Sequence, residues 1–322
     1  MSQSANNSPH RQTPKFSVAI TTAGYKNLIN NTLGDPERAK RFIGSVTSAV
    51  AVNPVLQECE AGTILAAALL GESLNLSPSP QLGQYYMVPF EVKVKDANGK
   101  IIYLKDENGK NLKDARGRWI AETVKKAQFV LGYKGYIQLA LRSGYYADLD
   151  VIEIRTGEYL GRDKTTGKHC FEFIEDDDRR DTMEVIGYMA YFEYLNGFKK
   201  VIYWTKKKMM SHADQYSPAF SAAAYEKLQK GEISDDDLWK YSSFWYKEFD
   251  DMAKKTMLRQ LISKWGVMST EMQRVMAADA SIIEIGAQNE LVTTTEEQLA
   301  LEQPDLQPEA VDVVENINLD SL

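Results

Sequence analysis

The hydrophobic positions of the chain change their period along the sequence, and this change separates helical parts from a part rich in strands. Asp35-Pro36 offers an N-cap and a first-turn proline, which predict a helix that ends near Val52. Asn53-Pro54 repeats the signal for a second helix that ends near Leu74. The Ser-Pro-Ser-Pro segment at 77–80 ends this helical part, because proline cannot continue a helix.

From residue 84 onward, apolar and polar positions alternate, as is typical of half-buried strands. Asn98-Gly99 and Asn108-Gly109 indicate hairpin turns, and residues 114–117 predict a longer turn. A helix at about 134–143 interrupts this part. The strands that the alternation predicts are 84–94, 100–104, 119–123, 127–131, 148–155, 170–174, 185–194 and 200–204.

The remaining segments return to helical spacing, at about 206–214, 218–229, 235–264 and 271–277. This order favours an α+β fold: a central, largely antiparallel sheet with hairpins, flanked by N-terminal helices and a long C-terminal helix. Residues 34–278 form the predicted core domain. Residues 1–33 are predicted to be an N-terminal segment that is partly disordered, and residues 279–322 to be an acidic, flexible tail.

The charges are distributed unevenly along the chain. It has 38 Lys and Arg residues against 45 Asp and Glu residues, a net charge of −7. No Lys or Arg follows Arg274, whereas 11 of the acidic residues do, so residues 1–274 carry 38 basic and 34 acidic groups. The body of the protein is therefore mildly basic, and it suits a nucleic-acid partner that the whole-chain average argues against.

Nothing in the sequence indicates export or a membrane anchor. Two cysteines give no disulfide framework, and the first residues are polar. The longest apolar run, residues 64–70, is too short to span a membrane. We expect a soluble protein of the cytoplasm.

Signals for catalysis are weak. The three histidines are not at metal-ligand spacing. The acidic run Glu175–Asp178 could hold Mg²⁺, but the two arginines that follow it favour a solvated loop. Residues 161–168 resemble a phosphate-binding loop, yet five residues separate the glycines instead of four, and His169 stands where Ser or Thr must bind Mg²⁺. We expect a hairpin loop there, no catalytic residue, no metal ion and no cofactor: the protein is predicted not to be an enzyme.

The segment from Phe244 to Gly266 predicts one helix with an apolar face and a basic face. Asp250 and Asp251 can pair with the lysines four residues further on. Arg259 has no acid three or four residues away, so an anion from outside the chain explains its charge beside Lys255 better than helix stabilisation does. A solvated face is the alternative. The apolar face consists of Met257, Leu258, Leu261, Ile262 and Trp265.

Two strand-to-helix junctions also carry binding signals. Lys206, Lys207 and Lys208 place three cations on the first turn of a predicted helix, against its dipole and with no acid four residues on. A phosphate at that N-terminus would relieve the cost, although an exposed, frayed turn would also do so. In Gly132–Tyr136, GYKGY, the glycines allow close backbone approach and the tyrosines offer stacking faces, with Arg142 on the side of the central lysine. The alternative is that these tyrosines belong to the core.

Short motifs stand in a characteristic order along the chain: LGESLNL at 70–76, LGQYYMVPF at 82–90, GYKGY at 132–136, LALRSG at 139–144, TKK at 205–207, MAKKT at 252–256 and EMQR at 271–274. Together with Arg259, this set resembles the RecT family of phage single-strand annealing proteins, which is related to the Red beta annealing protein. The resemblance spans roughly residues 53–279. Between Val92 and Val124 the hairpin region is longer than in other sequences of this family, and from the sequence it could contact DNA, a neighbouring subunit or only solvent.

The resemblance implies a protein that binds single-stranded DNA without ATP, forms rings or helical filaments on it, and anneals it to a complementary strand. It also implies a phage exonuclease as partner, a basic groove for DNA, and a phage- or prophage-encoded protein in the bacterial cytoplasm. Lys254 is more readily a structural residue than a DNA contact, because it falls near the apolar face and Asp250 can pair with it. The predicted DNA-binding residues are Lys134, Arg142, Lys206, Lys207, Lys208, Lys255 and Arg259 for phosphates, Tyr133 for a base or sugar, and Lys254.

Other classes of function remain open from the sequence. A Mg²⁺-dependent nucleic-acid enzyme would use Glu175–Asp178, and an interaction scaffold would turn its basic face to an acidic protein. The acidic tail could compete with DNA for the basic groove, recruit a partner, or only keep the protein in solution.

Overall fold

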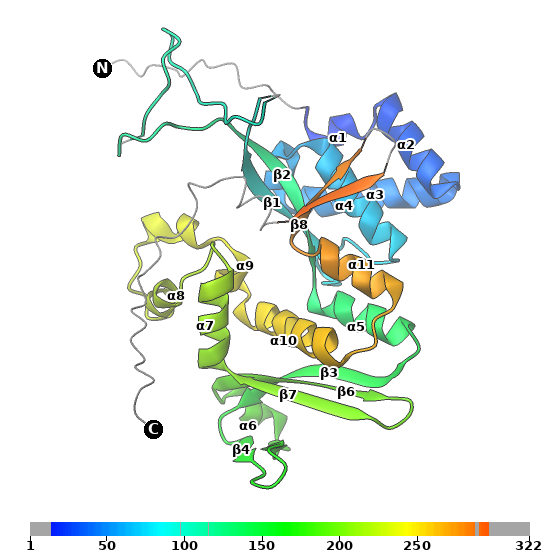
Figure 1. Ribbon diagram of the computed structural model, residues 1–322, viewed down its shortest axis with the longest axis vertical. Coiled ribbons are helices and arrows are strands. Elements are labelled where there is room, and N and C mark those ends of the chain that lie inside the picture. The colour runs from blue at the N-terminus through cyan, green and yellow to red at the C-terminus, as the bar shows by residue number, and fades with distance from the viewer. Residues whose placement is uncertain (1–13, 97, 115, 287–289, 296–322) are drawn as a thin grey trace, which may run out of the picture.

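The computed structural model describes residues 14–96, 98–114, 116–286 and 290–295. Helices and antiparallel sheets are combined in it, so the predicted α+β class is confirmed. Of the three sheets in the described residues, Figure 1 shows the four-stranded one near the N-terminal helices and the three-stranded one at the opposite end, with helices packed between them. These are α5 (Tyr133–Arg142), α10 (Phe249–Trp265) and α11 (Thr270–Ala278).

The first part of the chain forms helices that pack on one another. Asp35 accepts a hydrogen bond from the Glu37 backbone N–H, and Pro36 starts α3, as the N-cap signal predicted. The predicted second helix is divided into a short 3-10 helix and an α-helix that starts at Ala61. Two helices lie in the segment predicted to be partly disordered, whose residues 1–13 lie outside the described part. The elements are α1 (Phe16–Ala19), α2 (Ala23–Leu33), α3 (Pro36–Val52), η1 (Pro54–Glu58) and α4 (Ala61–Ser73).

The first sheet has the strand order β1-β2-β8-β9 and is antiparallel throughout. Pro89 lies in β1 at the edge of the sheet, where the missing N–H of proline is tolerated. Ser281–Ile285 and Leu291–Thr295 fall in the segment that we predicted to be a flexible tail, but they form two strands of this sheet. Residues 287–289 and 296–322 of that segment lie outside the described residues. The strands are β1 (Tyr85–Lys93), β2 (Thr123–Leu131), β8 (Ser281–Ile285) and β9 (Leu291–Thr295).

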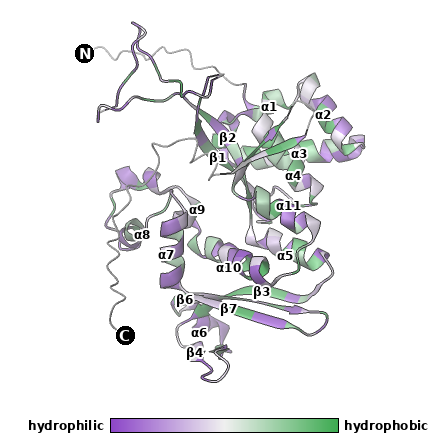
Figure 2. Ribbon diagram, in the orientation of Figure 1, coloured by the Kyte–Doolittle hydropathy of each residue, from purple (hydrophilic) through white to green (hydrophobic). Residues whose placement is uncertain are grey.

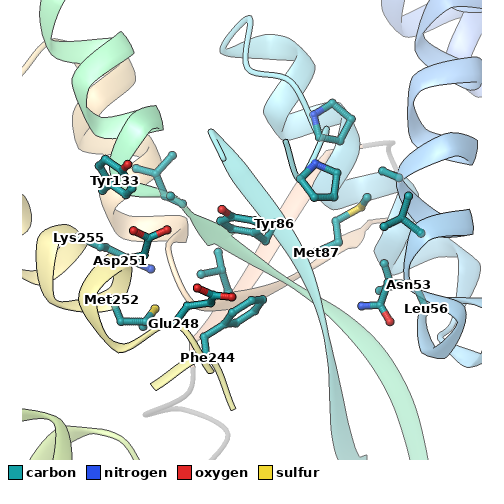
Figure 3. Close-up of a pocket in the computed structure, with 17 residues that line it drawn as sticks. Asn53, Leu56, Tyr86, Met87, Tyr133, Phe244, Glu248, Asp251, Met252 and Lys255 are labelled. Atoms are coloured by element: carbon teal, nitrogen blue, oxygen red, sulfur yellow. The ribbon is translucent and has the colours of Figure 1, made fainter. Parts of the chain in front are cut away.

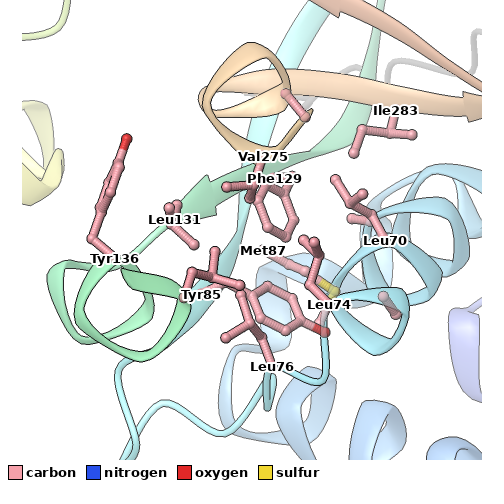
Figure 4. Close-up of a cluster of buried hydrophobic side chains, with 14 of the residues drawn as sticks. Leu70, Leu74, Leu76, Tyr85, Met87, Phe129, Leu131, Tyr136, Val275 and Ile283 are labelled. Atoms are coloured by element: carbon pink, nitrogen blue, oxygen red, sulfur yellow. The ribbon is translucent and has the colours of Figure 1, made fainter. Parts of the chain in front are cut away.

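A buried cluster joins this sheet to the helices on both sides of it (Figure 4). Tyr85 of β1 and Phe129 of β2 stack with ring centroids 5.0 Å apart, and both are fully buried. Leu70 reaches the cluster from α4, Val275 from α11 and Ile283 from β8. The cluster therefore packs α4 and the strands β1 and β2 against α11 and β8, which lie far from them in the sequence.

Between β1 and β2 the chain leaves the body as an arm, residues 94–122, which Figure 1 shows projecting away from the helices. Its three turns begin at Asp96, Asp106 and Asp114. Each of these side chains accepts hydrogen bonds from the backbone N–H groups two and four residues further on. The two Asn-Gly turns were predicted, and the third turn is of the same kind rather than longer. The predicted strands 100–104 and 119–123 form isolated bridges in the arm.

The second sheet has the strand order β3-β6-β7 and carries different elements on its two faces. Tyr188 and Phe192 face α10 and α5 in the main core. On the other face, Tyr159 of a small hairpin stacks on Tyr203 at 4.5 Å. Residues 161–168 lie in this hairpin, as predicted. The elements are β3 (Tyr146–Arg155), β4 (Tyr159–Arg162), β5 (His169–Phe171), α6 (Asp177–Asp181), β6 (Val185–Tyr194) and β7 (Lys199–Thr205).

The helix predicted at 235–264 is divided twice. A 3-10 helix ends at Tyr241, and after a short α-helix the backbone at Glu248 leaves the helical region with φ −133° and ψ 54°. The apolar face of α10 is buried as predicted, except that Trp265 is 48% exposed and has the Lys200 ammonium 3.8 Å from its ring centroid. Among the described residues, no helix has the length and apolar character needed to cross a membrane. The remaining elements are α7 (Lys206–Tyr216), α8 (Ala222–Gln229), η2 (Asp235–Tyr241) and α9 (Phe244–Lys247).

Candidate nucleic-acid interface

The carboxylate of Asp279, directly after α11, is buried and accepts hydrogen bonds from four donor groups. Lys255 Nζ lies 2.8 Å from Oδ1, and Arg259 Nη1 lies 2.9 Å from Oδ2. The Leu131 backbone N–H donates to Oδ1 at 2.9 Å, and the Tyr136 hydroxyl donates to Oδ2 at 3.2 Å. Burial raises the pKa of Tyr136, and the neighbouring carboxylate raises it further, so the hydroxyl keeps its proton. A buried carboxylate is tolerated when it is paired and hydrogen-bonded in this way.

The prediction that Arg259 lacks an acidic partner is therefore wrong. Its partner lies 20 residues further along the chain, beyond the reach of a count at helical spacing. Lys255, predicted to face DNA, is 8% exposed and directs its ammonium at Asp279. The Arg259 side chain is 44% exposed, so its outer N–H groups can still meet a phosphate.

The glycines of the Gly132–Tyr136 junction serve the packing of the chain on itself. A Cβ on Gly132 would lie 2.1 Å from the Gly83 carbonyl oxygen, and one on Gly135 would lie 2.1 Å from that of Gln84. Tyr136 is fully buried, which supports the alternative that it belongs to the core. Tyr133 is half-buried, and Lys134 is exposed.

We expect Gly135→Ala to lower the free energy of unfolding by about 1–3 kcal/mol, because backbone must move to admit the methyl group. Urea unfolding followed by circular dichroism measures the change. Gly44→Ala is the matched control, since a Cβ there meets no atom within 4 Å and alanine favours the helix α3. Equal midpoints for Gly135→Ala and the wild type would show that the loop before β1 does not pack here in solution.

Two of the aromatic rings that have a lysine ammonium over them, Tyr133 and Trp204, lie beside the candidate residues. The Lys134 ammonium lies 5.8 Å and the Lys254 ammonium 5.3 Å from the centroid of Tyr133. The Lys208 ammonium lies 4.3 Å from the centroid of Trp204. We call these five residues the ring–cation row. Rings of this kind offer stacking faces for bases, with positive charge for phosphates beside them.

The register of the second sheet brings the two rings onto the same side. Lys254 pairs with Glu153 at 2.8 Å, and Glu153, Tyr188 and Trp204 are successive partners across β3, β6 and β7. Paired residues of antiparallel strands share a face, and two strand spacings are about 10 Å. Burial alone would lower the pKa of Lys254, but the hydrogen bond and charge of Glu153 outweigh it and raise the pKa, so the ammonium stays charged.

Lys206, Lys207 and Lys208 begin α7 directly after β7, as the sequence predicted. The Thr205 side chain caps the helix by accepting a hydrogen bond from the Lys208 backbone N–H. Lys207 and Lys208 are exposed, and Lys206 is half-buried. No carboxylate forms an ion pair with any of the three in the part of the chain that the structure describes. Figure 2 shows α7 as largely hydrophilic, so the helix start is open to an anion.

Arg142 has a structural contact that the sequence did not reveal. Its Nη1 donates to the backbone carbonyls of Leu74 and Asn75 at 3.0 Å and 3.4 Å, directly after α4. Its Nε donates to the Gln138 carbonyl at 3.1 Å. The guanidinium therefore holds α5 to the end of α4, and a phosphate contact would have to use the donors that remain.

A cleft of about 430 Å³ lies across β1, between α3 and η1 on one side and α9 and α10 on the other (Figure 3). Tyr133 and Tyr86 line it together with Phe244, whose ring centroid is 5.4 Å from that of Tyr86. Glu248 and Asp251 also line it. This lining suits flat, uncharged rings, whereas its carboxylates disfavour phosphate.

The acidic run at 175–178 is built into local structure. Asp176 caps α6 by accepting a hydrogen bond from the Arg179 backbone N–H at 3.1 Å. Over the described ranges of the chain, no three His, Cys, Asp or Glu side chains form a group that could hold a metal ion. The geometry thus adds no support for the Mg²⁺-dependent alternative.

Comparisons with known proteins agree with the motif order. The RecT family model matches residues 40–294. The chain belongs to the RecT family. It is 31% identical over 279 residues to the uncharacterized protein YqaK of Bacillus subtilis (strain 168). The aligned residues cover 87% of this chain and 75% of YqaK. It is 24% identical over 252 residues to the protein RecT of Escherichia coli (strain K12). The aligned residues cover 75% of this chain and 71% of that protein.

Family membership confirms the resemblance and supports a recombination or annealing protein. The match also reaches past residue 279 through β8 and into β9. The two strands missed in the sequence thus lie within the matched range, except for the last residue of β9. The ring–cation row belongs to the same range.

Proposed function

We propose that this RecT family member binds single-stranded DNA without ATP, assembles on it as an oligomer and anneals it to a complementary strand. The family match over residues 40–294 carries the proposal. The open helix start at Lys206–Lys208 and the ring–cation row support it, because they offer phosphates a positive surface and bases a stacking face. Annealing breaks no covalent bond, so the protein needs no catalytic group.

Some of the predicted DNA-binding residues are exposed in the structure, whereas others bind other parts of the chain. Lys134, Lys206, Lys207 and Lys208 are proposed as phosphate contacts, with Arg259 as a half-exposed addition. Tyr133 is proposed for a base or sugar. Arg142, Lys254 and Lys255 bind other parts of the chain, and any contact of theirs with DNA would be secondary. A modest charge per subunit becomes effective when it repeats along an oligomer. A phage exonuclease as partner and the bacterial cytoplasm as location complete the proposal.

The proposal is tested by adding two labelled complementary oligonucleotides in turn, without ATP, and following duplex formation together with electron microscopy. We expect duplex to form faster than without protein, and rings or filaments to appear on DNA. If no oligonucleotide binds at low salt, the interaction scaffold becomes the better explanation. The label should stay in intact strands when Mg²⁺ is added; cleavage that Asp177→Asn abolishes would favour the enzyme.

A further inference from the structure

The arm between β1 and β2 contains two three-way strand junctions. In each junction, three backbone N–H···O=C hydrogen bonds run in a ring, with N···O distances of 2.8–2.9 Å. The two junctions connect three hairpins, and each hairpin ends in one of the three aspartate turns. The first ring joins Val94, Glu122 and Ile102, and the second joins Leu104, Ile120 and Leu112.

The bridges of the arm separate its side chains onto two faces. Tyr103 pairs with Ala121, Lys105 with Asn111, and Lys113 with Trp119. Paired residues share a face, and so do residues two apart on one strand. The ring of Tyr103 accordingly meets the ring of Trp119 edge-on, with centroids 5.2 Å apart. We call Tyr103, Lys105, Lys113 and Trp119 the aromatic–basic face; the aliphatic residues of the two rings lie on the opposite face.

The body does not cover the arm. None of the described residues from 91 to 124 is buried, and Trp119 is 55% exposed. Residues 95–120 carry seven basic and four acidic groups. Three of the four acids are the turn aspartates, whose carboxylates accept backbone N–H groups. The positive charge of Lys105 and Lys113, which are exposed beside the two rings, therefore faces outward.

From these observations we infer that the aromatic–basic face of the arm binds single-stranded nucleic acid, as a contact separate from the ring–cation row. Lys105 and Lys113 contact phosphates, and Trp119, supported by Tyr103, stacks on a base. A protein partner fits this face less well, because lysine is depleted from protein–protein interfaces. The inference rests on the proposed function, since it assigns a second contact to the same ligand.

The test is fluorescence anisotropy of a labelled oligothymidylate over a series of NaCl concentrations. We expect Lys105→Ala/Lys113→Ala to lower the slope of log K against log salt by about 1.4, since each phosphate contact on a single strand contributes about 0.7. Trp119→Ala should weaken binding about 5-fold or more with little change of slope. Lys26→Ala/Lys230→Ala, which removes two exposed cations from the helical body, is the matched control and should leave the slope unchanged.

The outcomes separate the inference from the function on which it rests. If the wild type binds and Lys206→Ala/Lys207→Ala lowers the slope, but the arm variants bind like the wild type, the arm inference is overturned and the function stands. If the arm variants bind DNA normally but sediment as smaller assemblies, the arm contacts a second copy of the chain, which also overturns it. If the wild type binds no oligonucleotide, the function and the inference fail together.

Discussion

Asp279→Asn should destabilise the protein by about 3–5 kcal/mol, because it leaves the buried ammonium of Lys255 without a counter-charge. The same carboxylate ties the end of α11 to the Leu131 backbone N–H at the end of β2 and to Tyr136 of α5. Its loss thus weakens three elements at once. Urea unfolding, with the free energy extrapolated to water, measures the change.

Two further variants sharpen this test. Glu226→Gln removes an exposed acid of α8 and should change the free energy of unfolding by no more than about 0.5 kcal/mol. Adding Lys255→Met to Asp279→Asn should recover part of the loss, since the unpaired buried charge is then removed. If Asp279→Asn unfolds at the wild-type urea concentration, the carboxylate is not buried against Lys255 in solution.

Lys206→Ala/Lys207→Ala should weaken single-stranded DNA binding about tenfold at moderate salt and lower the salt slope by about 1.4. Both lysines lie on the first turn of α7, where the helix N-terminus adds its N–H groups to their charge. Lys208 is kept, because its ammonium lies over the Trp204 ring. Anisotropy titrations at several NaCl concentrations measure both quantities.

The fold should survive this double substitution, because neither lysine forms an ion pair within the described residues. Unfolding midpoints of the variant and the wild type check this expectation. Lys26→Ala/Lys230→Ala again serves as the control for the loss of two exposed cations. An unchanged salt slope for the α7 variant would show that the start of α7 does not contact DNA.

Elements with strong local signals were predictable from the sequence. Strand β6 and helix α3 have the predicted bounds, and α5 and α7 differ from prediction by one or two residues at their ends. Periodicity and capping act between residues a few positions apart, so the local sequence is enough to predict these helices and this strand. The break at Glu248 and the strands β8 and β9 depend on packing between distant segments, which local patterns do not encode.

The candidate site was predictable in part, for a similar reason. The cations at Lys206–Lys208 and Lys134 were found because their neighbours in sequence leave them without acids. The sequence analysis missed Trp204 as a stacking ring, because this role depends on the Lys208 ammonium, which lies over the ring only in the folded structure. Asp279 carried a signal that was not used: it is the only charged residue in the run 275–283, VMAADASII, where a lone acid indicates a buried pair.

The sequence by itself determined the α+β class, the basic body and, through the order of its motifs, membership of the RecT family. Only the tertiary structure decided which cations are available to a ligand. Helical spacing detects partners three or four residues away, whereas Asp279 reaches Arg259 across 20 residues and buries Lys255. Charge pairing depends on distance in space, so Arg259 and Lys255 are largely neutralised within the chain, whereas the start of α7 and the exposed Lys105 and Lys113 of the arm remain open.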